Sequence, residues 1–150
     1  MRVLALDVGD KTIGAAVSDE LMITANGITT IDRIGIRKDA DKVLALVKEY
    51  GCSTVVIGLP LNLDGSDSIQ TEKVRDFRKM LENKMMSTGM KGIDVVYQDE
   101  RFTTKIAEAV LIEADVSRKK RKTVIDKQAA VIILRSYLDS RRIAESEVPY

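Results

Sequence analysis

The sequence contains no histidine, and this absence excludes several kinds of catalytic site. A Ser-His-Asp triad, a histidine general base and a histidine-ligated zinc site all need a side chain that the chain lacks. The single cysteine, Cys52, excludes a disulfide framework within one chain and any metal site built from several cysteines. If the protein is an enzyme, its acid–base chemistry depends on carboxylates, lysine, tyrosine or metal-activated water.

Segments for export or membrane insertion are also lacking. No apolar stretch approaches the roughly 20 residues that cross a bilayer. The N-terminus holds an arginine and a short apolar run that Asp7 interrupts, which is not typical of a signal peptide. We therefore expect a cytoplasmic protein without a membrane partner.

An excess of charge of one sign is missing as well, since 24 Lys and Arg balance 23 Asp and Glu. Hydrophobic residues make up 45% of the chain and charged residues 31%, as in ordinary globular proteins. A length of 150 residues predicts one domain, over residues 1–141, followed by a tail at 142–150.

Short β-rich runs alternate with helical periodicity along most of the chain. The predicted strands are Arg2–Asp7, Thr12–Ser18, Gly27–Arg33, Ser53–Gly58 and Ile93–Gln98. Four helices are predicted. The first covers residues 37–50, and the second buries Val74, Phe77, Leu81 and Met85. The third has Ile106, Ala107, Val110 and Leu111 in register, and the fourth, from 124 to 140, buries Ala129, Ala130, Ile133, Leu134 and Tyr137. This order predicts an α/β domain with helices packed on a mixed sheet.

Asp7 ends the first apolar strand, in the segment Asp7–Gly14. The strand looks central, and open α/β sheets bind ligands at the carboxyl ends of their strands. Gly9 permits a tight turn and Lys11 could reach an anionic group. On this segment alone, a simple strand-terminating turn is the stronger explanation.

Two further segments follow buried strands. The first is Gly58–Ser66, with Gly58, Pro60 and Gly65, and either Ser66 or Asp67 could cap the helix that follows. Its loop amides could hold a phosphate near the helix N-terminus, but by itself the segment is better explained as a strand-to-helix loop. Residues 98–104 contain the adjacent acids Asp99 and Glu100, then Arg101. Strand alternation points the two acids to opposite faces. A cap by Thr103 or Thr104 would explain the threonines but not the acidic pair.

Asp126 extends the apolar stripe of the last helix backwards by one helical period. A buried carboxylate needs a partner or a metal, although a position in the first helical turn explains it equally well. Together, the acids Asp7, Asp99 or Glu100, and Asp126 form an oxygen-only set of the kind that binds Mg²⁺ or Mn²⁺. Such ions support phosphodiester cleavage.

A basic run precedes Asp126. It consists of Arg118, Lys119, Lys120, Arg121 and Lys122. An isolated run of this kind is usually a solvated loop, but beside a carboxylate site it favours binding to phosphate groups. Few aromatic residues accompany it, so recognition of backbone or shape is favoured over base stacking.

The sequence resembles the YqgF family, also called RuvX, of Holliday-junction-resolvase-like nucleases, which is also assigned to 5′-end maturation of 16S rRNA. The matching motifs are Leu6–Asp19, Gly58–Gly65, Asp99–Thr104 and Asp126–Leu134. The resemblance implies an RNase H-like fold, whose sheet has three antiparallel and then two parallel strands. It also implies a Mg²⁺- or Mn²⁺-dependent centre with Asp7, Asp99 or Glu100, and Asp126 as its acids, Glu100 being the favoured ligand of the pair.

The leading hypothesis is a metal-dependent endonuclease on structured nucleic acid, either pre-rRNA or branched DNA, acting as a monomer or homodimer and near the ribosomal small subunit. Lys11, Arg101 and the basic run are the candidate nucleic-acid contacts, and Gly9, Gly14, Gly58, Pro60 and Gly65 the candidate structural loop residues. The alternative is a non-catalytic RNA-binding assembly factor on a nuclease scaffold. An actin-like ATPase ranks low, because it needs two such domains.

Overall fold

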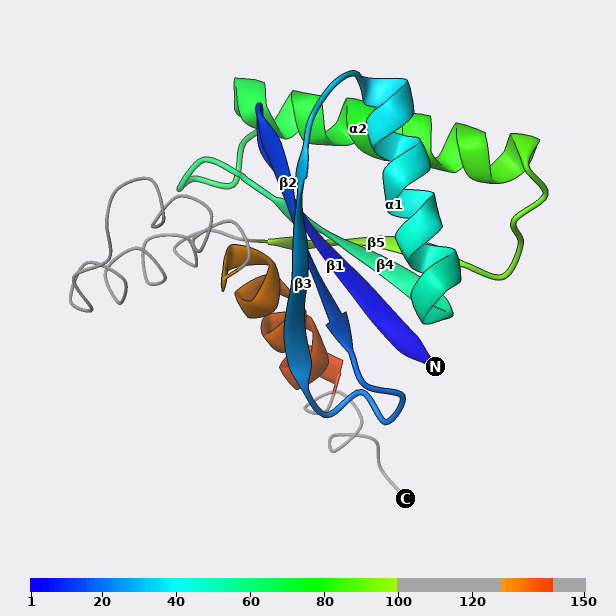
Figure 1. Cartoon of the computed structure of the whole chain (residues 1–150). Helices are drawn as coiled ribbons and strands as arrows, with labels where there is room; N and C mark the ends of the chain where they lie inside the picture. Colours follow the sequence, from blue (N-terminus) through cyan, green and yellow to red (C-terminus); the bar gives the residue numbers. More distant parts are fainter. Residues whose placement is uncertain (100–127, 142–150) are drawn as a thin grey trace.

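A five-stranded sheet forms the centre of the computed structural model, which describes residues 1–99 and 128–141 (Figure 1). The strands are β1 (Arg2–Val8), β2 (Thr12–Ser18), β3 (Ala25–Asp32), β4 (Cys52–Leu59) and β5 (Asp94–Asp99). Their order in the sheet is β3-β2-β1-β4-β5. The pairs β1–β2 and β2–β3 are antiparallel, whereas β1–β4 and β4–β5 are parallel. The predicted mixed sheet, with β1 in its middle, is confirmed.

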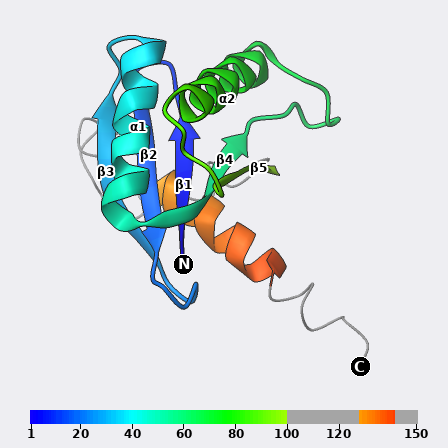
Figure 2. The ribbon, with the colours of Figure 1, turned by 90° about the vertical axis from the view of Figure 1, so that its right-hand side faces the viewer.

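Helices cover both faces of this sheet (Figure 2). The helices α1 (Ile36–Tyr50) and α2 (Ile69–Ser87) pack on one face, and the helix 128–141 packs on the other. The predicted apolar stripe of α2 is buried, and Gly51 ends α1 in the left-handed conformation that glycine adopts readily. None of the helices in the described ranges is long and apolar enough to cross a membrane.

Strand β1 is buried on both faces, and its side chains alternate between two hydrophobic cores. Leu4, Leu6 and Val8 pack into the core under α1 and α2. Val3 and Ala5 pack into the smaller core under the helix 128–141. Because a strand has a period of two, each further residue along β1 has its face fixed by this alternation.

The predicted bounds of the other described strands and of α1 agree with the structure within one residue, but those of β3 were wrong. It begins at Ala25 rather than Gly27, because its pairing with β2 starts where Ser18 faces Ala25. It ends at Asp32, so Arg33 lies outside the strand. The predicted helix around residues 106–111 and the first residues of the last helix lie outside the described residues, and the division into 1–141 and 142–150 stays a prediction.

A buried ion pair links the end of β3 to α1. The Nε atom of Arg33 donates to Oδ2 of Asp39 at 2.9 Å, and the amide of Ile34 donates to Oδ1 at 3.0 Å. The Asp39 side chain is 1% exposed and that of Arg33 16% exposed. Burial alone would raise the pKa of Asp39, but the hydrogen bonds from Ile34 and Arg33 outweigh it and hold the pKa below its ordinary value.

This ion pair predicts a specific dependence of stability on pH. Since the pKa of Asp39 is lowered on folding, its contribution is present above the unfolded pKa of about 4 and is lost as the pH falls further. We expect Asp39→Asn to lower the free energy of unfolding by about 3 kcal/mol at neutral pH, as for a broken buried pair. Urea unfolding between pH 7 and pH 3 measures this effect. The difference in the free energy of unfolding between Asp39→Asn and the wild type should shrink below about pH 4.

The matched control is Asp67→Asn, which breaks an ion pair with Arg75 in which both side chains are more than 40% exposed. Solvent screens that pair, so its loss should change stability much less. An equal effect of the two substitutions at neutral pH would contradict the prediction.

Candidate functional site

Asp7 is half-buried near the carboxyl end of the central strand. It lies between Leu6 and Val8, whose side chains face α1 and α2, so its own side chain is on the opposite face. That face is the one covered by the helix 128–141, with Val3 and Ala5 below Asp7 on the same strand. The predicted buried central strand that carries Asp7 is confirmed, and it ends one residue later than predicted, at Val8.

Glycine lies beside Asp7 on both neighbouring strands. Gly14 of β2 faces Asp7 directly. On the other side Leu6 pairs with Ile57, so the next residue of β4, Gly58, lies next to Asp7. At these two adjacent positions the neighbouring strands therefore carry no side chain. The next side chain across this face is that of Gln98, which pairs with Gly58.

Asp99 lies at the same edge of the sheet but on the other face. It pairs with Leu59, whose side chain packs in the core under α1 and α2. Tyr97, two residues earlier, packs against that same core. The described acids therefore do not converge: within residues 1–99 and 128–141, no three Asp, Glu, His or Cys side chains are grouped so as to hold a metal ion.

The turn after Asp7 joins β1 to β2. The amide of Gly9 donates to the carbonyl of Thr12 at 2.9 Å, and a Cβ atom at Gly9 would lie 3.1 Å from that oxygen. This close approach explains the glycine. Lys11 is exposed in the turn, and Asp10, whose role the sequence did not indicate, forms an exposed ion pair with Lys73 at 3.0 Å.

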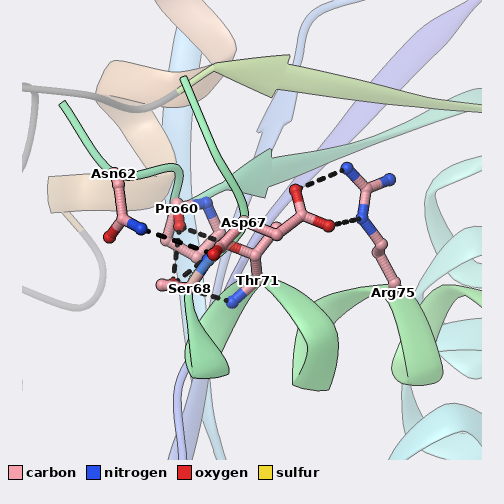
Figure 3. A network of polar contacts seen from close by, with 6 residues as sticks. All are labelled: Pro60, Asn62, Asp67, Ser68, Thr71 and Arg75. Carbon is pink, nitrogen blue, oxygen red and sulfur yellow. Dashed lines mark hydrogen bonds and ion pairs between the residues drawn. The ribbon is translucent and has the colours of Figure 1, made fainter. Parts of the chain in front are cut away.

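The loop between β4 and α2 is closed by its own polar groups (Figure 3). Its Gly65 has a φ of 88°, a conformation that favours glycine. The N-cap of α2 is Ser68, so the predicted cap at Ser66 or Asp67 was wrong. Ser68 and Thr71 satisfy each other's backbone amides in a reciprocal capping box, and both side chains also donate to the carbonyl of Pro60.

Ser66 and Asp67, the two residues predicted as caps, have other partners. The Ser66 hydroxyl donates to Asp64 at 2.6 Å, and both carboxylate oxygens of Asp67 accept from Arg75 at 3.1 Å. The spacing Ser-x-x-Thr at 68–71 was the signal in the sequence that marks the true start of α2.

Several predicted site residues lie outside the described residues. They are Glu100, Arg101, Arg118, Lys119, Lys120, Arg121, Lys122 and Asp126. Their roles stay predictions.

Two side chains that the sequence analysis did not single out contact the turn after Asp7. Arg33 donates to the carbonyl of Gly9, and Gln70 donates to the carbonyl of Val8. No local motif marks either residue. Asp39, which holds Arg33, did have a signal: it lies one helical period before Val43 on a buried stripe, the same pattern that identified Asp126.

A family model described as "RuvX: Holliday junction resolvase" matches residues 1–140. The chain belongs to the RuvX family. It is 50% identical over 138 residues to a Clostridioides difficile protein named "Putative pre-16S rRNA nuclease", which covers 92% of this chain and 94% of that protein. The resemblance indicated by the four motifs is confirmed.

Solved structures of resolvases share the fold of this RuvX-family chain. RuvC of T. thermophilus in complex with a Holliday junction substrate superposes with a TM-score of 0.58 at 12% identity, covering 95% of this chain and 96% of that one. Fowlpox virus resolvase in complex with Holliday junction DNA gives a TM-score of 0.57 at 14% identity, covering 94% and 99%. With the strand order β3-β2-β1-β4-β5, these matches confirm the predicted RNase H-like fold.

Cys52 lies far from this site, at the start of β4, where it faces Arg2 at the opposite end of β1 from Asp7. Burial raises the pKa of its thiol to about 11, against a small lowering by Arg2. The thiolate is the reactive form, so a rise of about two units reduces its population roughly 100-fold at neutral pH. Cys52 is a core residue rather than a nucleophile.

We therefore expect iodoacetamide to alkylate Cys52 of the native protein at least ~100-fold more slowly than a free cysteine at pH 7.5. Mass spectrometry of timed samples measures the rate, and unfolding in guanidinium should restore it. Alkylation of the folded protein at the rate of the unfolded one would contradict this assignment.

Proposed function

We propose that this RuvX-family chain is a metal-dependent endonuclease that hydrolyses phosphodiester bonds in structured nucleic acid. The observation that carries the proposal is Asp7: a half-buried carboxylate near the carboxyl end of the central strand, with glycine at the adjacent position of each neighbouring strand. Ligands of open α/β sheets bind at this end. Family membership and the nuclease name of the C. difficile relative support the same reaction.

The proposed substrate is the 5′ end of pre-16S rRNA, close to the small ribosomal subunit. The name of a relative that is 50% identical over most of both chains supports this choice. Branched DNA is the second candidate substrate, because RuvC and the fowlpox resolvase, which share the fold, were solved with Holliday junctions. We place the reaction in the cytoplasm.

The proposed cofactor is Mg²⁺ or Mn²⁺, held by Asp7, Glu100 and Asp126. The donor chemistry fits a hard cation: the chain has no histidine, and its single thiol is buried at the far end of β1. Such an ion supplies charge stabilisation and an activated nucleophile in phosphodiester hydrolysis. The part of Asp7 is to fix one oxygen ligand on the rigid central strand.

The register of β5 supports Glu100 rather than Asp99 as the ligand from the acidic pair. Asp99 lies on the face of α1 and α2, opposite to Asp7. A metal site that includes Asp7 therefore excludes Asp99 and leaves Glu100, the other acid of the pair. We propose that Glu100 binds the metal and that Asp99 does not.

Nucleic acid is proposed to bind through Lys11, Arg101 and the basic run 118–122. Lys11 supports this assignment because it is exposed in the turn that follows Asp7. Lysine and arginine contacts of this kind bind phosphates without reading sequence.

The test of the proposed function is a cleavage panel with a precursor-rRNA 5′ fragment and a four-way DNA junction, each with Mg²⁺ or Mn²⁺. We expect the wild type to cut the rRNA fragment and Asp7→Asn to lose at least ~100-fold in rate. Loss of a metal ligand should cost more than loss of a residue that only orients a ligand, which typically costs about 10- to 100-fold. Circular dichroism should show both proteins folded.

Asp10→Asn is the matched control, because it removes a carboxylate from the same turn, but one that pairs with Lys73 at the surface. It should keep most of the activity. Full metal-dependent activity in Asp7→Asn would refute the assignment. RNA binding without cleavage under either metal would favour the non-catalytic assembly factor instead.

A second comparison tests the acidic pair. We expect Glu100→Gln to reduce cleavage as severely as Asp7→Asn, and Asp99→Asn to stay within about threefold of wild type, because its carboxylate lies on the opposite face. Initial rates at saturating Mn²⁺ measure both variants. The reverse order of effects would show that Asp99 is the ligand.

A further inference from the structure

The turn that carries Asp7 into β2 lacks the backbone geometry that stabilises a tight hairpin by itself. Val8 pairs with Ile13 and Gly9 hydrogen-bonds to Thr12, which leaves Asp10 and Lys11 as a two-residue loop. Such loops usually adopt primed turns with positive φ, whose twist matches the strands. None of residues 9–12, all of which the structure describes, has a positive φ. This turn therefore depends on support from other elements.

Arg33 supplies that support on both sides of the loop. Its Nη1 atom donates to the carbonyl of Gly9 at 2.8 Å, and its backbone amide donates to the carbonyl of Lys11 at 2.9 Å. Arg33 thus holds both Gly9, the residue before the loop, and Lys11, the second residue of the loop.

The guanidinium of Arg33 is itself fixed from two directions. Asp39 accepts from its Nε atom at 2.9 Å and is locked by the Ile34 amide. The buried ring of Phe77 lies 5.5 Å from the Arg33 Cζ atom, within the range of a cation–π contact. Because guanidinium is planar and makes several hydrogen bonds at fixed angles, this arrangement gives it one orientation.

Helix α2 holds the remaining parts of the turn. Gln70 donates to the carbonyl of Val8 at 3.3 Å, and Lys73 pairs with the Asp10 carboxylate at 3.0 Å. Every residue from Val8 to Lys11 is thus contacted by Arg33 or by α2. The side-chain contacts of Arg33 and Gln70 are partly buried, whereas the Lys73–Asp10 pair is exposed.

We propose that Arg33, oriented by Asp39, is a positioning residue that fixes the Asp7 carboxylate by holding the turn of residues 8–11. This inference rests on the proposed nuclease function. Arg33 contacts the Phe77 ring in the core under α1 and α2, whereas the Asp7 side chain is on the other face of β1. Arg33 therefore acts through the backbone and does not touch the reacting atoms.

Arg33→Lys tests the inference, because lysine keeps a positive charge for Asp39 but offers one ammonium group in place of the guanidinium fork. We expect kcat to fall on the order of 10- to 100-fold, as for a catalytic group displaced by about 1 Å, with little change in KM. Amide exchange at Gly9, followed by NMR without metal, should accelerate at least ~10-fold, since the turn then opens more often.

Arg75→Lys is the matched control. It makes the same chemical change in an arginine that also binds a carboxylate, with Nε and Nη2 each 3.1 Å from Asp67, but on the exposed side of α2. It should leave kcat and the exchange rate at Gly9 unchanged. Urea unfolding of both variants separates a loss of global stability, which moves all protected amides together, from a change confined to the turn.

Wild-type values of kcat or of Gly9 exchange in Arg33→Lys would overturn the inference, as would faster exchange at every protected amide without a selective change in the turn. Failure of the nuclease proposal looks different: the wild type then cuts neither substrate with either metal. In that case the inference is tested by two measurements on Arg33→Lys and the wild type. One is the amide exchange rate at Gly9, and the other is the Mn²⁺ affinity, measured from NMR line broadening of residues next to Asp7. An unchanged exchange rate at Gly9 or an unchanged Mn²⁺ affinity in Arg33→Lys overturns the inference. Faster exchange at Gly9 together with weaker Mn²⁺ binding supports it.

Discussion

The burial of β1 between two hydrophobic cores is the constraint on which the rest of the structure depends. Leu4, Leu6 and Val8 must face α1 and α2, and Val3 and Ala5 must face the helix 128–141, because a shift by one residue would exchange the two sets. The parallel register with β4 and β5 transmits the same alternation across the sheet. The faces on which Asp7 and Asp99 lie are therefore consequences of core packing.

Much of the fold could be predicted from the sequence, because hydrophobic periodicity is a local signal. Strands buried on both faces are continuous apolar runs, and the stripe through Val74, Phe77 and Leu81 has helical spacing. The N-cap of α2, Ser68, was missed because several polar residues compete for one cap, and the choice depends on partners such as Arg75 and the Pro60 carbonyl.

The surroundings of Asp7 were less predictable, since they are made by residues distant in the chain. Gly9 and Arg33 are 24 residues apart, and Val8 and Gln70 are 62 apart. No local pattern encodes such contacts. The motif residues identify the family, whereas the interactions that hold the turn in place become visible only once β3, α1 and α2 are packed around it.

The two glycines beside Asp7 have a consequence for substrate selection. On the adjacent strands, Gly14 and Gly58 are buried and place no side chain directly beside the carboxylate. A position without a side chain makes no side-chain contact with a base edge, so neither glycine can read a base in that way. Discrimination must arise elsewhere on the surface.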